Sequence, residues 1–148
     1  LAVSEAGDVY IADSCNGRIR RVRNGFIETV AGADQSRPRG AAGPATNINI
    51  GQTRDVVFGN LSEGGPPSLY IACTPGLVWR LDEKENMAIP VAGTWTDGYN
   101  WDEGFALETR LNVPCGLAAF GQTLVIADSS NQRVLFLEEG DGTSPKAS

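Results

Sequence analysis

The segment from residue 93 to residue 105, GTWTDGYNWDEGF, mixes aromatic and acidic side chains to an unusual degree. Tryptophan and tyrosine dominate binding hot spots, and loops on rigid scaffolds carry much of protein function. The acidic spacing does not match a calcium loop, because Tyr99 stands where an oxygen ligand is needed. Either these rings bind a protein partner or they pack a connection within the fold. The candidate partner-binding residues are Trp95, Asp97, Tyr99, Trp101 and Asp102.

Two aspartates, Asp13 and Asp128, stand at equivalent places, and each is followed five residues later by an arginine, Arg18 or Arg133. Carboxylates in such positions could hold a cation on one face of the molecule. They could also accept hydrogen bonds from the backbone amides of the polar turn that follows. Repetition at equivalent places favours the structural role. The two arginines would then pair with these acids or lie across the seam between repeats.

Four arginines, at positions 18, 20, 21 and 23, form a concentrated positive charge. Such a cluster could bind an anion or RNA. However, the formal net charge of the chain is −6, and no aromatic residues alternate with the arginines to stack on bases. A solvated edge or an acidic protein partner is therefore favoured over nucleic acid.

Histidine is absent from the 148 residues. A Ser-His-Asp triad or an imidazole-bound zinc therefore cannot come from this segment alone. No phosphate-binding glycine loop is present, and Cys15, Cys73 and Cys115 lack the spacing of a metal site. We therefore expect no catalytic residues, no metal site and no cofactor here, and a non-enzymatic role is favoured.

No apolar run approaches the ~20 residues that a membrane-spanning helix needs, so we expect no membrane insertion. The triplet Asn60-Leu61-Ser62 is an acceptor sequence for N-glycosylation. This triplet slightly favours the secretory pathway, a lumen or the extracellular space as the compartment. Nothing else in the sequence predicts the compartment.

The strands that must position these residues are repeated along the chain. Tyr-Ile-Ala-Asp at 10–13 returns as Tyr-Ile-Ala-Cys at 70–73 and as Val-Ile-Ala-Asp at 125–128, and Val-Ala-Gly at 30–32 returns at 91–93. In the first copy, runs rich in Val, Ile, Tyr or Phe alternate with turn residues, including Asn24-Gly25, which predicts antiparallel strands. Repeated four-stranded units predict an all-β fold of the β-propeller type. The strands expected in the first unit are residues 1–3, 9–12, 18–22 and 26–30.

The stretch GDVYIADSCNGRIRRV followed by TVAG resembles the NHL repeat, and DEGFALETRLNVPCGLA resembles the crossover between two blades of that family. The resemblance implies one propeller segment over residues 1–148, with four-stranded blades at about 1–32, 54–93 and 114–137. The third blade would lack its outer strand, and residues 138–148 would form a tail. NHL propellers usually close with six blades, so an incomplete arc of a six-bladed ring is implied.

The function that this resemblance implies is a protein-binding or scaffold module, whose rigid blades present loops to a protein partner. An open arc would leave two apolar faces exposed, so the remaining blades of the same propeller are a second expected partner. The alternative is a propeller lyase or hydrolase with a metal in the central channel. The complete ring could also hold Ca²⁺.

Overall fold

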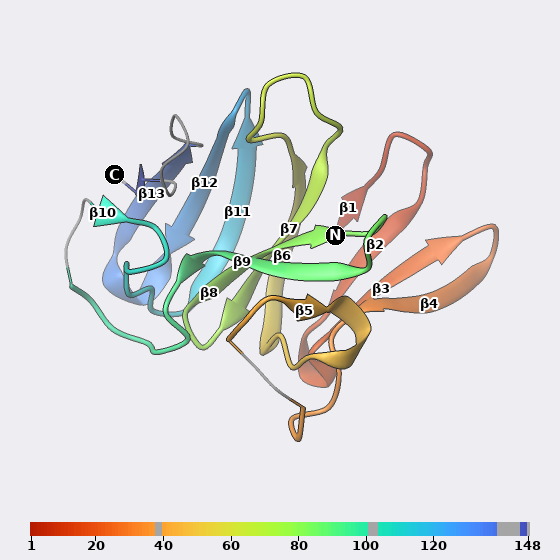
Figure 1. Cartoon of the computed structure of the whole chain (residues 1–148), viewed down its shortest axis with the longest axis horizontal. Helices are drawn as coiled ribbons and strands as arrows, with labels where there is room; N and C mark the ends of the chain where they lie inside the picture. The colour runs from red at the N-terminus through yellow and green to blue at the C-terminus, as the bar shows by residue number, and fades with distance from the viewer. Residues whose placement is uncertain (38–39, 101–103, 139–145, 148) are drawn as a thin grey trace.

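The computed structural model describes residues 1–37, 40–100, 104–138 and 146–147, and this part of the chain is all-β. Three antiparallel sheets follow one another along the sequence, and none of them closes into a barrel. Figure 1 shows the sheets side by side in chain order, with the middle sheet between the other two. We call them the first, second and third sheets.

The first sheet is a simple meander in which each strand pairs with the next along the chain. The predicted strands are confirmed to within one residue at each end. Asn24 and Gly25 both have positive φ, 51° and 80°, as expected for a tight two-residue hairpin turn. The strands are β1 (Ala2–Val3), β2 (Val9–Asp13), β3 (Arg18–Arg23) and β4 (Phe26–Ala31).

The second sheet repeats this meander and adds a short strand at its outer edge. The extra strand, β5, comes from the crossover that leaves the first sheet, and it pairs with the last strand of the second. This sheet consists of β5 (Gly43–Pro44), β6 (Gln52–Gly59), β7 (Ser68–Thr74), β8 (Leu77–Asp82) and β9 (Met87–Gly93).

The third sheet has the same plan, and it has an outer strand that the sequence did not suggest. Lys146 and Ala147 pair with Glu138 and Leu137, so part of the segment expected as a tail forms a two-residue fourth strand. A short strand from the crossover into the third sheet pairs with this fourth strand. The strands are β10 (Gly104–Phe105), β11 (Pro114–Phe120), β12 (Thr123–Asp128), β13 (Arg133–Glu138) and β14 (Lys146–Ala147).

The repeated Val-Ala-Gly has a steric cause. Gly32 and Gly93 have φ of +91° and +93°, a region that L side chains rarely adopt. A Cβ at Gly32 would lie 2.2 Å from the carbonyl oxygen of Gly17, and one at Gly93 would lie 2.1 Å from that of Gly76. Only glycine therefore lets the chain at the end of the fourth strand of the first and second sheets approach the turn between the second and third strands.

Two hydrophobic cores fill the spaces between the sheets. The first core packs Tyr10 and Ile19 of the first sheet with Ile71 and Trp79 of the second. The second core lies between the second and third sheets. The middle sheet is thus buried on both faces, which explains why its strands β7 and β8 are apolar almost throughout.

Candidate functional site

One end of the three sheets gathers the turns and the crossovers, and we call it the loop end. Because neighbouring strands run in opposite directions, the turns β2–β3, β7–β8 and β12–β13 share this end with the described parts of the two crossovers, residues 32–37, 40–51, 94–100 and 104–113 (Figure 1). Two of these turns contain a three-residue 3₁₀ helix, η1 (Ser14–Asn16) and η3 (Ser129–Asn131). The predicted turn-forming and partner-binding residues that the structure describes all lie here.

Asp128 is wholly buried and holds the β12–β13 turn together. Its carboxylate accepts hydrogen bonds from the Asn131 side-chain amide and from Nε of Arg133, each at 2.8 Å. It also accepts one from the backbone N–H of Asn112, at 2.6 Å, which ties the preceding crossover to the turn. The groups that donate to Asp128 from the β12–β13 turn are therefore side chains. The sequence had suggested the backbone amides of the turn as donors. Of the two roles that the sequence left open for Arg133, the structure shows the ion pair with Asp128.

Asp13 occupies the equivalent place in the first sheet and makes fewer contacts. The side-chain amide of Asn16 donates to both of its carboxylate oxygens, at 2.9 and 3.0 Å. Arg18 pairs with Asp13 in the strand register. In the described part of the chain, no ion pair joins their side chains. Asp13 thus shapes its turn through Asn16.

The predicted partner-binding loop is anchored at several points. Oδ1 of Asp97 accepts a hydrogen bond from the backbone N–H of Gly76 at 2.8 Å, which links the loop to the β7–β8 turn. The carbonyl of Gly98 accepts one from the side chain of Asn131 at 2.8 Å, which links it to η3. The side chain of Asn100 bonds the backbone at Glu108 and Arg110. The loop therefore bridges the second and third sheets.

Tyr99 is more than half exposed, and its ring lies under the guanidinium of Arg133, 4.8 Å from the ring centroid. Such a cation–π contact holds the ring against the third sheet. Trp101 and Asp102, also predicted to bind a partner, lie outside the described residues.

Trp95 packs inward although its loop is at the surface. Its ring meets that of Trp79 edge to face, with 6.1 Å between the centroids and 75° between the planes. Trp79 is fully buried and donates through Nε1 to the carbonyl of Ile50 at 3.0 Å. Trp95 has φ of +65°, an unusual value for an aromatic residue, so the packing holds its backbone in the left-handed region.

Trp95 also lines a pocket of about 330 Å³, which we call the loop-end pocket. Its walls come from η1, from the crossover that follows the first sheet, from the start of the β7–β8 turn and from the predicted loop. Trp95, Pro75 and Cys15 supply its less polar surface. Its polar side chains include two carboxylates, four amides and one hydroxyl, namely Asp34, Asp97, Asn16, Gln35, Asn49, Gln52 and Thr74.

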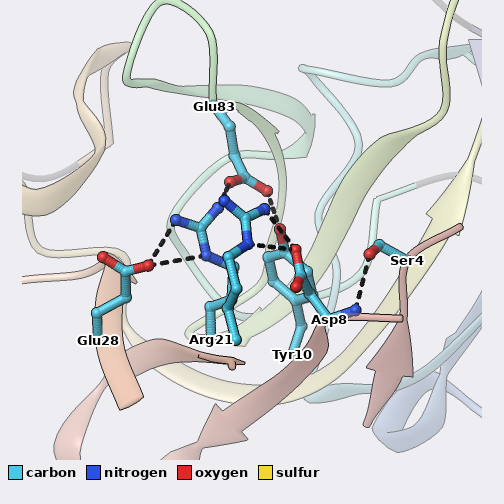
Figure 2. A network of polar contacts seen from close by, with 7 residues as sticks. Ser4, Asp8, Tyr10, Arg21, Glu28 and Glu83 are labelled. Atoms are coloured by element: carbon cyan, nitrogen blue, oxygen red, sulfur yellow. Dashed lines mark hydrogen bonds and ion pairs between the residues drawn. The ribbon is translucent and has the colours of Figure 1, made fainter. Parts of the chain in front are cut away.

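A second polar cluster lies at the opposite end of the sheets. Figure 2 shows Glu83, from the β8–β9 turn, accepting hydrogen bonds from the hydroxyl of Tyr10 and from Arg21. Arg21 also donates to Glu28 of its own sheet, at 2.6 and 3.0 Å. Burial, followed by the bond to Glu83, raises the pKa of Tyr10. These contacts lock the first sheet to the second.

Two of the four clustered arginines, Arg21 and Arg23, form ion pairs within the chain. Arg23 forms an ion pair with Asp8, and its hydrogen bond lowers the pKa of that carboxyl. Arg20 donates to the hydroxyl of Thr29 at 2.9 Å. The acidic partners of Arg21 and Arg23 are residues of the same chain.

In the described parts of the chain, no three side chains of Cys, Asp or Glu are grouped so as to hold a metal ion. Within the same residues, no helix has the length and apolar character needed to cross a membrane.

No protein-family model matches this sequence, and no curated protein matches it either. Among solved structures, the chain is similar to the crystal structure, at 1.70 Å resolution, of a structural genomics protein of unknown function from Bacteroides thetaiotaomicron. The TM-score is 0.67 at 18% sequence identity. The match covers 87% of this chain and 32% of that protein, so the chain spans less than half the length of that relative. The two share a fold.

Sequence reasoning found Trp95 and Asp97 but missed the rest of the loop-end pocket. Asp34, Gln35 and Asn49 lie in a crossover with no aromatic or repeated signal. They reach the pocket only because the crossover returns across the end of two packed sheets. Cys15, for which the sequence predicted no role, is exposed and lines the pocket.

Proposed function

We propose that the chain is a three-sheet arc of an NHL-type β-propeller and acts as a protein-binding module. Supporting the arc, Ile11, Ile71 and Ile126 occupy the same register position in three consecutive sheets. The crossovers repeat as well, since the N–H of Gly32 donates to Ala45, and that of Gly93 to Ala106, at 2.8 and 2.9 Å. A fold shared with part of a longer protein agrees with a segment of a larger array.

The ligand that the loop-end pocket suits best is a basic side chain in an extended segment of a protein partner. The observation that carries this proposal is the charge of the pocket: it contains Asp34 and Asp97, and no lysine or arginine lies among its described lining residues. Hydrogen bonds from the hydroxyl and the backbone amide of Ser36 lower the pKa of Asp34, so this carboxylate is charged at neutral pH. A lysine or arginine would find two acceptors there.

The uncharged residues that line the pocket suit the backbone and the aliphatic side-chain parts of such an extended segment. Side-chain amides offer both donors and acceptors, as the backbone of an extended peptide requires. Trp95 and Pro75 provide an apolar surface on which the aliphatic part of a lysine or arginine can pack. The pocket also sits on two packed sheets, so binding needs little reordering of its walls.

The test begins with selection of displayed random peptides on the wild-type chain, followed by calorimetric titration of the best binder. We expect selected peptides to contain lysine or arginine. The double variant Asp34→Asn and Asp97→Asn keeps the side-chain carbonyls that accept from Ser36 and Gly76 but removes both charges. It should bind roughly tenfold more weakly, which corresponds to about 1.4 kcal/mol.

The matched control is Glu63→Gln with Glu85→Gln, which makes the same charge change at two exposed residues outside the pocket. This control should bind like the wild type. Peptides that lack basic residues and bind the Asp34→Asn, Asp97→Asn variant with undiminished affinity would contradict the proposal.

A further inference from the structure

A cavity of about 600 Å³ lies at the end of the sheets opposite the loop end, and we call it the hairpin-end cavity. The β1–β2 turn, the β6–β7 loop and the β11–β12 turn all contribute to its walls. Asp8, Tyr10 and Glu83 line it as well, so the polar cluster of Figure 2 forms one of its sides. A volume of this size is within the range of small-molecule binding sites.

The cavity is the space that a short turn leaves open. Between the second and third sheets, the loop formed by residues 60–67 places Leu61 in the second core, where this side chain is 8% exposed. The corresponding turn of the first sheet, residues 4–8, is shorter, and within the described chain it adds no side chain to the first core. The hairpin end of the first interface is therefore hollow, whereas Leu61 occupies that of the second.

The walls of the cavity belong to two sheets that are neighbours within the chain. Tyr10 and Phe58 both line it, and their rings meet edge to face, with 5.1 Å between the centroids and 87° between the planes. Tyr10 lies on the face of the first sheet that packs against the second. Any sheet before residue 1 would cover the opposite face of the first sheet, and any sheet after residue 148 would follow the third. Either addition leaves these walls in place.

Asp8 gives the cavity a charged group that is only partly satisfied. Its side chain is 9% exposed. Oδ2 accepts hydrogen bonds from Nε of Arg23, at 2.8 Å, and from a second nitrogen of the same guanidinium. In the described chain, no donor bonds Oδ1. Buried carboxylates usually accept hydrogen bonds on both oxygens, so a ligand in the cavity could supply the missing donor.

The charge of the wall is predominantly negative. Glu5, Asp8 and Glu83 line the cavity, and Arg23 is the one cationic side chain among its described lining residues. The hydrogen bond from Arg23 lowers the pKa of Asp8, so this carboxylate is charged at neutral pH. These charges favour a cation over an anion or a neutral molecule.

The rest of the wall is apolar or lacks hydrogen-bond donors. Phe58 and Ala119 are apolar, and Pro66 and Pro67 have no backbone N–H. The side-chain amide of Asn60 already donates to a carbonyl of its own loop. A suitable ligand therefore brings its own donors and has a hydrocarbon part to cover the apolar surface.

We propose that the hairpin-end cavity binds a small organic ammonium ion with an apolar body. The ammonium group donates to the carboxylate of Asp8, and the hydrocarbon part packs on Phe58 and the two prolines. Hydrogen bonds between two charged groups are about twice as strong as neutral ones, so the carboxylate selects the cation. This site is separate from the loop-end pocket and does not rest on the proposed function.

The test uses three probes of nearly equal size that differ in charge: phenethylammonium, phenethyl alcohol and phenylacetate. Each is titrated into isotope-labelled protein, and binding is followed through the backbone amide signals in NMR spectra. The ammonium ion should bind with a dissociation constant of about 1 mM, as expected for a ligand of this size. The alcohol should bind about tenfold more weakly and the carboxylate more weakly still. The largest signal changes should include Gly59 and Gly121, which line the cavity.

Two variants test the carboxylate and the space separately. Asp8→Asn keeps a carbonyl that can accept from Arg23 but removes the charge, so it should weaken binding of the ammonium ion about tenfold and leave binding of the alcohol unchanged. Ala6 is an exposed turn residue that lines the cavity, so Ala6→Trp should fill the space without disturbing the core and should abolish binding of every probe. Circular dichroism checks the folding of both variants, and Ala6→Trp alone tests the site if Asp8→Asn does not fold.

The matched control is Glu108→Gln, which removes a negative charge at an exposed residue outside the cavity and should bind phenethylammonium like the wild type. The Asp34→Asn, Asp97→Asn variant should also do so, which separates this site from the loop-end pocket. The proposal is overturned if phenylacetate binds as tightly as phenethylammonium, or if Asp8→Asn or Ala6→Trp binds the ammonium ion with undiminished affinity. It is also overturned if no probe at about 10 mM changes the signals of Gly59 and Gly121.

Discussion

The buried carboxylate of Asp128 bonds Nε of Arg133 at 2.8 Å, whereas in the described structure Asp13 makes no ion pair with Arg18 at the same spacing. The difference follows from what covers each turn. The crossover into the third sheet lies over Asp128 and donates the N–H of Asn112 to it. In the first sheet, Asp13 is only partly buried and bonds Asn16. Equal sequence spacing therefore produces one buried network and one local turn.

This contrast predicts unequal effects of substitution. Asp128→Ala leaves the guanidinium of Arg133, which is only 10% exposed, without its carboxylate. We expect the free energy of unfolding to fall by about 3–5 kcal/mol, as when one partner of a buried pair is removed. Asp13→Ala should cost about 1 kcal/mol. Urea unfolding measures both, and equal losses would show that the burial of Asp128 has no energetic consequence.

The repeated glycine contacts predict a second pair of unequal effects. Gly93→Ala combines a positive φ with a Cβ placed 2.1 Å from the carbonyl oxygen of Gly76, so backbone must move. We expect a loss of more than ~2 kcal/mol in the free energy of unfolding. Gly25→Ala has a positive φ but no atom within 4 Å of the new Cβ, and should cost about 1 kcal/mol. Thermal melts that shift equally for the two variants would contradict the steric explanation.

The ion pair of Asp8 with Arg23 predicts a pH dependence. The pKa of Asp8 is lowered from its ordinary value of 3.8, so the folded state favours the charged carboxylate. The resulting stabilisation is complete well above pH 3.8 and is lost as the pH falls through the lower, folded-state value. The melting temperatures of the wild type and Asp8→Asn should therefore differ at neutral pH and converge in strong acid. Glu5→Gln makes a matched change at an exposed site, and its melting temperature should not converge with that of the wild type in this way. Convergence for Glu5→Gln as well would contradict the assignment of the pH dependence to Asp8.

The three thiols should differ in reactivity. Cys15 and Cys115 are exposed, while Cys73 is fully buried, and burial raises the pKa of its thiol. A thiol reagent such as Ellman's should modify Cys15 and Cys115 in the native protein, and Cys73 only on unfolding. A peptide bound at the loop-end pocket should slow the reaction at Cys15 and leave Cys115 unchanged. Rapid native reaction at Cys73 would contradict its burial.

Much of the fold could be predicted because its signals are local. Alternating apolar residues and Asn24-Gly25 define the first sheet, and similar runs define the others. The strand formed by Lys146 and Ala147 was missed, because two residues carry no periodicity and they pair with residues farther back in the chain, Glu138 and Leu137. The crossover strands β5 and β10 were missed for the same reason.

The candidate site was likewise predicted only in part. Trp95 and Asp97 were identified because aromatic and acidic residues concentrate in one loop. Their contacts were not predictable: Trp95 packs on Trp79, and Asp97 bonds the N–H of Gly76, a residue from a different turn. The same holds for Arg21, whose acidic partner Glu83 comes from another sheet.

The sequence by itself determined the repeat, the strands, the tight turns and the glycines that the close backbone approach requires, because these depend on neighbouring residues and on steric limits at single positions. Only the tertiary structure decided which faces are covered, which arginines are neutralised and how three separate segments form the loop-end pocket. Those outcomes depend on contacts between residues far apart in the chain, and such contacts exist only once the sheets have packed.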